Sequence, residues 1–346
     1  MQSPSEGNAL ARSRAALARA GVIDVHAHVV LADTMQAAGS YGPELGCNED
    51  GTPWFRVGDY CLHGVRYEGS PFMDPELRIA AMDRAGIDMQ VLSPNPLTYF
   101  HFIPAEEATA FCRRHNDALA ALVARFPERF AGFAAVPMQD TTEACAELRR
   151  AVEQLGLLGP YIGTDFGRHL NDPGLDPFYA TVADLDVPLF IHPGPAGIDG
   201  PPGDRNLRQF DLDIIVGFAA QETIAVATLI YGEVLERHPK LDICISHAGG
   251  AIVALIGRLE AACQKRSWAP AYLQREGAFQ AQLRRLWFDA HVHDARVAGL
   301  VIELLGTERL VLGTNFAGWD QGETTLLGER AATLGANAKR LLRASP

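Results

Sequence analysis

Four histidines stand in or at the end of short apolar runs, the first of which is rich in β-branched residues. They are His26 and His28 in VIDVHAHVV (22–30), His192 in PLFIHPG (188–194) and His247 in LDICISHAGG (241–250). Side chains two residues apart in a β-strand point to the same face, so His26 and His28 would converge. Because neutral imidazole is a common ligand of zinc and other divalent ions, the pattern indicates a metal site.

A His-x-His pair alone is weak evidence, since two ordinary hydrogen-bonded histidines give the same spacing. The interpretation is strengthened because histidines end two further apolar runs, whereas a core histidine is usually solitary. His291 and His293 stand just past another apolar run and are weaker candidates for the same site.

The chain after residue 21 alternates apolar runs with amphipathic stretches. Strands are expected over 22–30, 89–95, 130–138, 159–166, 188–194, 241–250, 285–293 and 310–316. Helices are expected over 74–86, 104–127, 141–156, 176–186, 221–239, 251–268, 294–306 and about 323–342. Strands that are connected by helices run parallel, and eight such units predict an α/β fold, the (β/α)₈ TIM barrel. A doubly wound open sheet is the alternative, but it normally carries a Gly-rich turn where this chain has histidines.

Most of the chain is expected to form one domain over 22–346, preceded by an N-terminal arm over 1–21 that forms a short exposed helix or a frayed end. Residues 31–73 interrupt the alternation and predict a small β insertion after the first strand. Residues 195–213, rich in Gly, Pro and Asp, predict a long loop. Both segments leave strand C-terminal ends, the face where barrel active sites lie, so both are expected to cover substrate.

Charge, hydrophobicity and cysteine content limit the possible binding partners and the cellular location. The 346 residues include 30 Lys plus Arg and 42 Asp plus Glu, so the formal net charge is −12. This acidic balance argues against nucleic acid and anionic membrane as partners. The chain has no apolar run long enough for a transmembrane helix. Its 6 cysteines are irregularly spaced, which indicates free thiols in the cytoplasm.

The histidine pattern resembles the amidohydrolase superfamily, and more narrowly its aminocarboxymuconate semialdehyde decarboxylase-like family. The similar segments are WFRV (54–57), DPELRIAAMDRAGIDMQVLS (74–93), RFAGFAAVPMQ (129–139), IGTDF (162–166), LFIHP (189–193), HPKLDICISHAGGA (238–251), GRLE (257–260), FDAHVHD (288–294) and LVLGTN (310–315). Some superfamily members hold two metals through a carboxylated lysine on strand four. No lysine precedes Lys240 here, so the resemblance implies one divalent ion, most often Zn²⁺.

The resemblance also implies roles for the matching residues. His26, His28 and His192 would bind the metal, and His247 would be the acid–base catalyst. Asn315 stands where the family has an Asp that serves as metal ligand and proton carrier. An amide keeps a carbonyl oxygen for coordination but has no charge and carries no proton near neutral pH.

Two arginines match family residues that hold substrate carboxylates. They are Arg56 and Arg258, and the second would reach across a homodimer interface. A guanidinium grips a carboxylate with two hydrogen bonds, so the chemistry supports both roles. From the residues alone, the favoured interpretations are a surface side chain for Arg56 and a helical ion pair for Arg258.

Three functions fit these residues. The first is a metal-dependent decarboxylase (a lyase) of a small aromatic or unsaturated carboxylic acid, with His247 supplying the proton. The second is a hydrolase or dehydrative cyclase acting on an aromatic amide or ester, in which Asn315 donates a hydrogen bond to an oxyanion. The third is a metal-free ligand-binding pseudoenzyme, against which the retained histidines argue. Asp320, expected on a loop, is a candidate to compensate for the missing charge at Asn315.

Overall fold

The computed structural model describes residues 9–323 and 330–344. Its eight parallel strands are β1 (Ile23–Val29), β5 (Met89–Pro94), β6 (Phe130–Gly132), β7 (Tyr161–Ile162), β8 (Leu189–Ile191), β9 (Ile243–Ile245), β10 (Trp287–Asp289) and β11 (Leu310–Val311). One sheet has the order β1-β5-β6, and the other has the order β11-β10-β9-β8-β7. Single parallel bridges join the sheets at both seams, Asp24 to Leu312 and Ala134 to Pro160. The strands therefore follow one another round a ring in chain order, which confirms the predicted TIM-barrel class.

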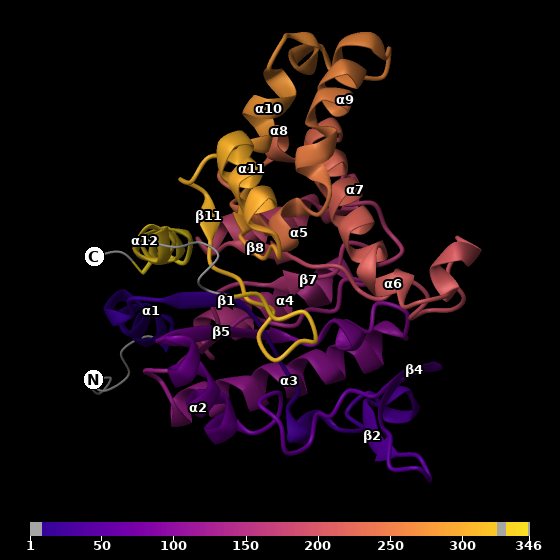
Figure 1. Cartoon of the computed structure of the whole chain (residues 1–346), viewed down its shortest axis with the longest axis vertical. Coiled ribbons are helices and arrows are strands. Elements are labelled where there is room, and N and C mark those ends of the chain that lie inside the picture. The colour runs from indigo at the N-terminus through magenta and orange to yellow at the C-terminus, as the bar shows by residue number, and fades with distance from the viewer. Residues whose placement is uncertain (1–8, 324–329, 345–346) are drawn as a thin grey trace.

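The helices lie outside this ring (Figure 1). They are α1 (Ala9–Arg19), α2 (Pro75–Ala85), α3 (Ala105–Arg125), α4 (Thr141–Glu153), α5 (Asp176–Asp184), α6 (Leu212–Ile215), α7 (Gly217–Tyr231), α8 (Val234–Arg237), α9 (Ile252–Lys265), α10 (Ala278–Leu283), α11 (Ala295–Leu305) and α12 (Ala331–Leu341). Short 3₁₀ helices are η1 (Ala32–Thr34), η2 (Gly39–Tyr41), η3 (Pro96–Thr98), η4 (Pro173–Leu175), η5 (Arg205–Arg208), η6 (His247–Gly249) and η7 (Ala271–Gln274).

Capping residues set several of the helix ends. Asp74 accepts hydrogen bonds from two backbone amides at the start of α2, and Gly86 ends that helix with φ 68°. Asp140 caps α4, because its side chain accepts from the amides of Thr142 and Glu143. The last helix is described from residue 330 on, and the predicted stretch at 324–329 lies outside the described residues.

Helix α1 differs from the exposed arm that we expected. Leu17 is fully buried and belongs to the main hydrophobic core, together with Leu10 and Ala16. Ser13 Oγ also donates a 3.0 Å hydrogen bond to the Gly156 carbonyl. Burying these apolar side chains holds the helix against the barrel. The first eight residues of the predicted arm lie outside the described part of the chain.

The predicted insertion forms its own small antiparallel sheet. Its strands are β2 (Glu44–Cys47), β3 (Pro53–Val57) and β4 (Tyr60–His63), paired in the order β2-β3-β4. Phe55 and Val57 are buried in a core separate from that of the barrel. Figure 1 places β2 and β4 at the opposite end of the long axis from α9 and α10.

One apolar segment starts earlier than predicted. Among the described residues, Leu212–Tyr231 is long and apolar enough to cross a membrane by length and composition. It consists of α6 and α7, and Ala225, Val226, Leu229 and Ile230 are buried in the main core. These four side chains pack α7 into the barrel core, while 39% of the apolar window as a whole is buried.

A buried arginine links α2 to the strands that carry the site. Arg78 is 1% exposed. Its guanidinium donates to the carbonyls of Pro71 and His28 at 2.7 and 2.6 Å, and to Gln90 Oε1 at 2.9 Å. Burial disfavours the charged form and lowers the pKa of Arg78 to about 10.

The same network contains a buried carboxylate. Asp24 is fully buried on β1 and accepts hydrogen bonds from Gln90 Nε2 at 3.0 Å and Thr314 Oγ1 at 2.7 Å. Burial raises the pKa of Asp24 to about 6, although these hydrogen bonds oppose the shift. The network therefore ties together α2, β1, β5 and the segment after β11.

Replacing Arg78 tests how much this network stabilises the fold. We expect Arg78→Met to lower the free energy of unfolding by about 3–5 kcal/mol, because buried Asp24 loses its nearby positive charge. Urea unfolding followed by circular dichroism measures the change. The control is Arg84→Met, an exposed position on the same helix, which should change stability by about 0.5 kcal/mol or less. A loss at Arg78 no larger than that of the control would contradict the assignment.

Candidate metal centre

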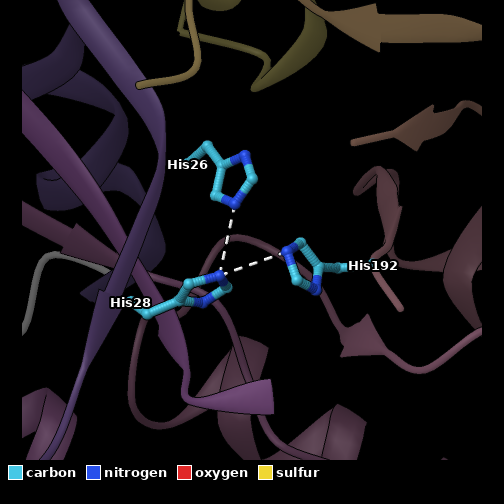
Figure 2. Close-up of side chains that lie close together, drawn as sticks. All are labelled: His26, His28 and His192. Atoms are coloured by element: carbon cyan, nitrogen blue, oxygen red, sulfur yellow. Dashed lines mark hydrogen bonds between the residues drawn. The ribbon is translucent and has the colours of Figure 1, made fainter. Parts of the chain in front are cut away.

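Three of the predicted metal-binding histidines meet at the C-terminal ends of β1 and β8. His28 Nε2 lies 3.2 Å from His26 Nε2 and 3.3 Å from His192 Nε2 (Figure 2). All three side chains are buried, and one ligand atom from each lies within 4.8 Å of the others. The period-two spacing of His26 and His28 thus produces the convergence that the sequence predicts.

The second ring nitrogen of each histidine faces an oxygen that can only accept. Nδ1 of His26 lies 2.8 Å from Asp289 Oδ2, Nδ1 of His28 lies 3.0 Å from the Pro94 carbonyl, and Nδ1 of His192 lies 2.7 Å from the Pro193 carbonyl. A carbonyl or carboxylate only accepts, and the hydroxyls of Ser93 and Tyr99, 2.9 and 3.3 Å from Nδ1 of His28 and His192, can accept as well. Each Nδ1 can therefore carry the proton, which leaves each Nε2 its lone pair.

Three lone pairs that face one another repel unless a cation lies among them. A tetrahedral Zn²⁺ with bonds of about 2.0–2.1 Å to nitrogen separates its ligand atoms by about 3.3–3.4 Å. The observed Nε2 separations of 3.2 and 3.3 Å match this geometry. The three histidines therefore could hold a metal ion, in both chemistry and spacing.

Burial keeps these imidazoles in the form that binds metal. It lowers the pKa of His28 to about 3, and it lowers the pKa values of His26 and His192 well below the usual range. Neighbouring imidazoles add to the effect on His26 and His192, because a second positive charge would be repelled. All three are neutral near pH 7, as a ligand must be.

Asp289 is a site residue that the sequence reasoning missed. It ends β10 and is 3% exposed, and its Oδ1 accepts from the His291 amide at 3.1 Å. Burial raises the pKa of Asp289, and the nearby imidazoles of His247 and His291 oppose the shift. Its position at the C-terminal end of a predicted strand was the available signal in the sequence.

Removing the charge of Asp289 tests this support of His26. We expect Asp289→Asn to weaken Zn²⁺ binding by about 10–100-fold, as is typical for partners of ligating histidines. Competition with a chromophoric chelator measures the dissociation constant. Asp165→Asn is the control, since Asp165 is exposed and its side chain accepts from a backbone amide that an Asn oxygen can also satisfy. Equal affinities for the two variants would contradict the role of Asp289.

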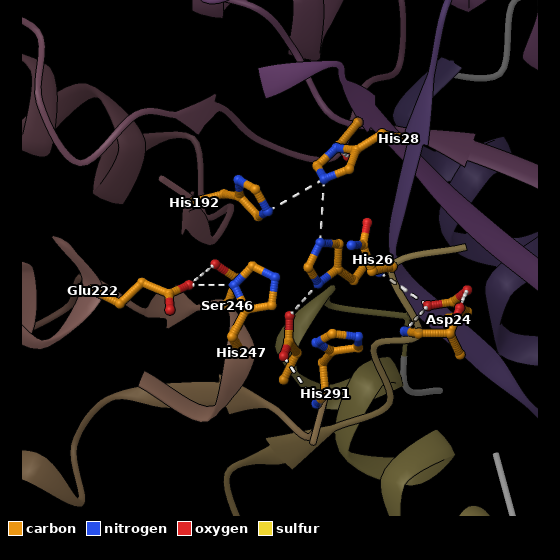
Figure 3. Close-up of polar contacts among 12 residues, drawn as sticks. Asp24, His26, His28, His192, Glu222, Ser246, His247 and His291 are labelled. Atoms are coloured by element: carbon orange, nitrogen blue, oxygen red, sulfur yellow. Dashed lines mark hydrogen bonds and ion pairs between the residues drawn. The ribbon is translucent and has the colours of Figure 1, made fainter. Parts of the chain in front are cut away.

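His247 lies beside the three ligands and has its own carboxylate partner. Its Nδ1 is 2.6 Å from Oε1 of Glu222, a fully buried side chain on α7 that also accepts from Ser246 (Figure 3). Burial is the largest single influence and lowers the pKa of His247, but the charge and hydrogen bond of Glu222, together with the charges of Asp289 and Asp320, raise the pKa to about 9. Glu222 was not predicted, because a carboxylate in the middle of an apolar helix carries no spacing signal.

The turn that carries His247 is tightly constrained. His247 and Ala248 have φ values of 46° and 53°, and Gly249 and Gly250 follow with φ 75° and 66°. A Cβ on Gly250 would lie 2.2 Å from the Ala219 carbonyl oxygen of α7. Only glycine fits there, so the sequence SHAGG packs His247 against the helix that supplies Glu222.

His291 also belongs to this cluster. It is 5% exposed, and its ring centroid lies 5.0 Å from that of His247 and 5.6 Å from that of His26. His291 Nε2 donates to the Asp320 carbonyl at 2.9 Å. The His293 side chain is 56% exposed, and its Nε2 lies 3.8 Å from Asp320 Oδ2.

Asn315 lies after β11, close to the first strand. It adopts φ 48°, a left-handed conformation in which Asn and Asp are enriched, and the next residue donates its amide to the His26 carbonyl at 3.2 Å. Asn315 Nδ2 donates to Asp320 Oδ1 at 2.6 Å. The side chain of Asn315 is thus directed to a carboxylate that the sequence places on the same loop.

Arg56 lines a cavity of about 730 Å³ between the insertion and the loop before α6. The guanidinium donates to Glu44 through Nε at 3.2 Å and to the Gly58 carbonyl at 2.7 Å. A second nitrogen, Nη2, lies 2.7 Å from Glu44 Oε1. A substrate carboxylate would therefore compete with Glu44 for Arg56. Within the described residues, the lining of this cavity does not include the four histidines.

Arg258 is not brought to the same place. It is exposed on α9, and Figure 1 places α9 at the opposite end of the molecule from β2 and β4. The insertion that carries Arg56 and the helix that carries Arg258 thus lie apart in this chain.

Fold and site define a (β/α)₈ barrel with a three-histidine metal site at the mouth of its strands. The chain matches the family described as Amidohydrolase over residues 23–344 and belongs to that family. This confirms the resemblance that the histidine pattern indicates.

The relatives include several decarboxylases. The chain is 32% identical to a 2-amino-3-carboxymuconate-6-semialdehyde decarboxylase of Dictyostelium discoideum, a match that covers 70% of this chain and 66% of the relative, just under two thirds of its length. The structure is similar to that of Metarhizium anisopliae IDCase, with TM-score 0.75, 22% identity, and coverage of 95% and 98% of the two chains. It is also similar to a dihydroxybenzoic acid decarboxylase from Polaromonas sp. JS666 with bound manganese and 2-nitroresorcinol, with TM-score 0.71, 21% identity, and coverage of 93% and 97%.

Proposed function

We propose that this protein is a mononuclear metal-dependent decarboxylase, a carbon–carbon lyase that removes CO₂ from a small aromatic or unsaturated carboxylic acid. The observation that carries the proposal is the convergence of three imidazole lone pairs beside a separate histidine–carboxylate pair. The decarboxylase relatives support the same class of reaction.

His26, His28 and His192 would hold the metal, with Asn315 next to them. Zn²⁺ is the favoured ion, because imidazole ligands suit zinc whereas carboxylate and water ligands suit manganese. When bound, the divalent ion supplies a Lewis acid that polarises the oxygens of the substrate. The buried Nδ1 partners of the three histidines keep the ligand set rigid.

His247 would carry the proton that the reaction needs. Decarboxylation breaks the bond between the carboxylate carbon and the substrate carbon, and a proton must take the place of the departing CO₂. Glu222 holds Nδ1 of His247, so the Nε2–H is free to donate to that carbon. Glu222 also stabilises the imidazolium form, as a buried carboxylate beside a catalytic histidine does.

The cavity between the insertion and the 196–213 loop would admit the substrate. Tyr60 of β4 donates to Asp213 of α6 at 3.3 Å, so the two covering segments are joined. Arg56 faces this cavity and would exchange Glu44 for the substrate carboxylate. A fork of two N–H groups favours a planar carboxylate over neutral ligands.

The hydrolase or cyclase alternative depends on Asn315 as a hydrogen-bond donor to an oxyanion. Its amide nitrogen already donates to Asp320. The second N–H of this amide stays available, so the decarboxylase is preferred because of its relatives and the His247–Glu222 pair.

Release of CO₂ from the zinc-loaded enzyme tests the proposal. With a panel of hydroxy- and aminobenzoates, we expect activity on at least one member. His247→Asn should reduce kcat by about 10²–10⁴-fold while zinc stays bound, because general acid catalysis is lost. Asn tolerates the left-handed backbone at this position. The control is His169→Asn, an exposed turn residue. Zinc-loaded enzyme that releases no CO₂ from any member would overturn the proposal.

A homodimer is the proposed assembly. Ile215 of α6, Val216 between the two helices and Ile224 of α7 are 51%, 50% and 65% exposed. Helix α7 packs beside α9, which carries Arg258. Exposed apolar side chains of this kind are typical of a protein interface. Across it, Arg258 would reach the substrate of the partner subunit.

Mixing two inactive variants tests whether each active site contains residues of both subunits. We expect Arg258→Ala and His247→Asn each to be nearly inactive, and their equal mixture to recover about a quarter of the wild-type activity after subunit exchange, since hybrid dimers contain one intact site. Absence of recovery with proven hybrid dimers would contradict the role of Arg258, and sedimentation as a monomer would contradict the dimer.

The cytoplasm is the proposed location. All six cysteines are free, and three of them are buried. Free thiols persist in a reducing compartment.

A further inference from the structure

Asn315 and Asp320 form a pair that the proposed reaction leaves unexplained. Asn315 Nδ2 donates to Asp320 Oδ1 at 2.6 Å, and the Asp320 side chain is only 18% exposed. One member of the pair is a neutral amide and the other a carboxylate. The pair therefore brings one negative charge to the mouth of the barrel, and the charge comes from Asp320, five residues after Asn315.

The loop from 314 to 322 is folded so that Asp320 returns to the site. The Gly322 amide donates to the Thr314 carbonyl at 2.8 Å, and the Gly318 amide donates to the Asn315 carbonyl at 2.9 Å. Thr314 Oγ1 is in turn held by Asp24 of β1 at 2.7 Å. Asp320 is thus anchored to the strand that carries His26 and His28.

Two imidazoles of the site face this carboxylate. His247, His291 and Asp320 each offer a ligand atom within 4.8 Å of the others. His291 also donates to the Asp320 backbone carbonyl. A carboxylate this close to the histidine cluster favours positive charge there, and partial burial limits screening by solvent.

We propose that Asp320 supplies the carboxylate that the metal centre of this chain uses in place of one at position 315, and that Asn315 positions it through its amide. The inference deepens the proposed function and rests on it. Asp320 acts through space as the nearby anion that stabilises the cation among the three histidines, and no coordination by Asp320 is required.

The proposal predicts that metal binding needs one carboxylate in this pair, and that either residue 315 or residue 320 can carry it. Asp320→Asn leaves two amides that can still hydrogen-bond, so the loop keeps a similar contact without the charge. Adding Asn315→Asp restores one carboxylate and one amide with the direction of the hydrogen bond reversed. The backbone at position 315, φ 48°, accepts Asp as well as Asn.

The experiment measures Zn²⁺ affinity of the full chain by chelator competition in three variants. We expect Asp320→Asn to weaken binding by about tenfold or more, in the range seen for residues that support a metal site. The exchanged variant, Asn315→Asp with Asp320→Asn, should recover affinity to within about threefold of wild type. Asp204→Asn is the charge-matched control, because Asp204 is exposed and its side chain accepts only from Asn206 among the described residues.

Several results would overturn the proposal. An affinity of Asp320→Asn equal to that of Asp204→Asn would show that the carboxylate has no influence on the metal. Failure of the exchanged variant to bind more tightly than Asp320→Asn would show that the loop, and not the charge, matters. A second zinc equivalent in wild type that Asp320→Asn loses would make Asp320 a ligand of another ion.

The metal affinities separate this inference from the proposed function. Enzyme that releases no CO₂ but shows the loss and the recovery of affinity would keep the inference and reject the decarboxylase. Release of CO₂ by the wild-type enzyme, together with an unaltered Zn²⁺ affinity of Asp320→Asn, would keep the decarboxylase and reject the inference.

Discussion

The site depends on three hydrogen bonds that point away from it. Each ligating histidine donates its Nδ1–H to an oxygen, a carboxylate for His26 and backbone carbonyls for His28 and His192. These bonds fix the tautomers, so three lone pairs must share one small space. A cation resolves the repulsion, and the Nε2 spacing matches a tetrahedral ion. The barrel contributes by bringing β1 and β8, which are far apart in sequence, to one mouth.

The sequence predicts the ligands because their positions follow local rules. His26 and His28 share a face through strand periodicity, and His192 ends an apolar run whose helical neighbours identify a parallel strand. The fold class follows from the same alternation. Strand lengths are less predictable, since β7 spans only Tyr161–Ile162 where 159–166 is expected.

The partners of the ligands could not be predicted in the same way. His26 and Asp289 are 263 positions apart, and Glu222 faces His247 from the middle of an apolar helix. Such pairings arise only when the ring closes, and they leave no periodic pattern in the chain. Helix α1 shows a related limit, because its burial comes from a tertiary surface that the arm itself does not encode.

The charges of the site come from different elements. Asp289 ends β10, Glu222 lies on α7, and Asp320 lies on the loop after β11. Behind them, Asp24 and Arg78 form a separate buried network that holds β1 in place. This arrangement surrounds neutral imidazoles with carboxylates, which suits a site that binds a divalent ion and a protonated histidine together.

X-ray absorption at the zinc edge of the zinc-loaded protein reports the ligand atoms of the ion. We expect three imidazole nitrogens at about 2.0–2.1 Å and no sulfur in the first coordination shell. A shell with sulfur, or with fewer than two imidazoles, would contradict a metal centre built from His26, His28 and His192.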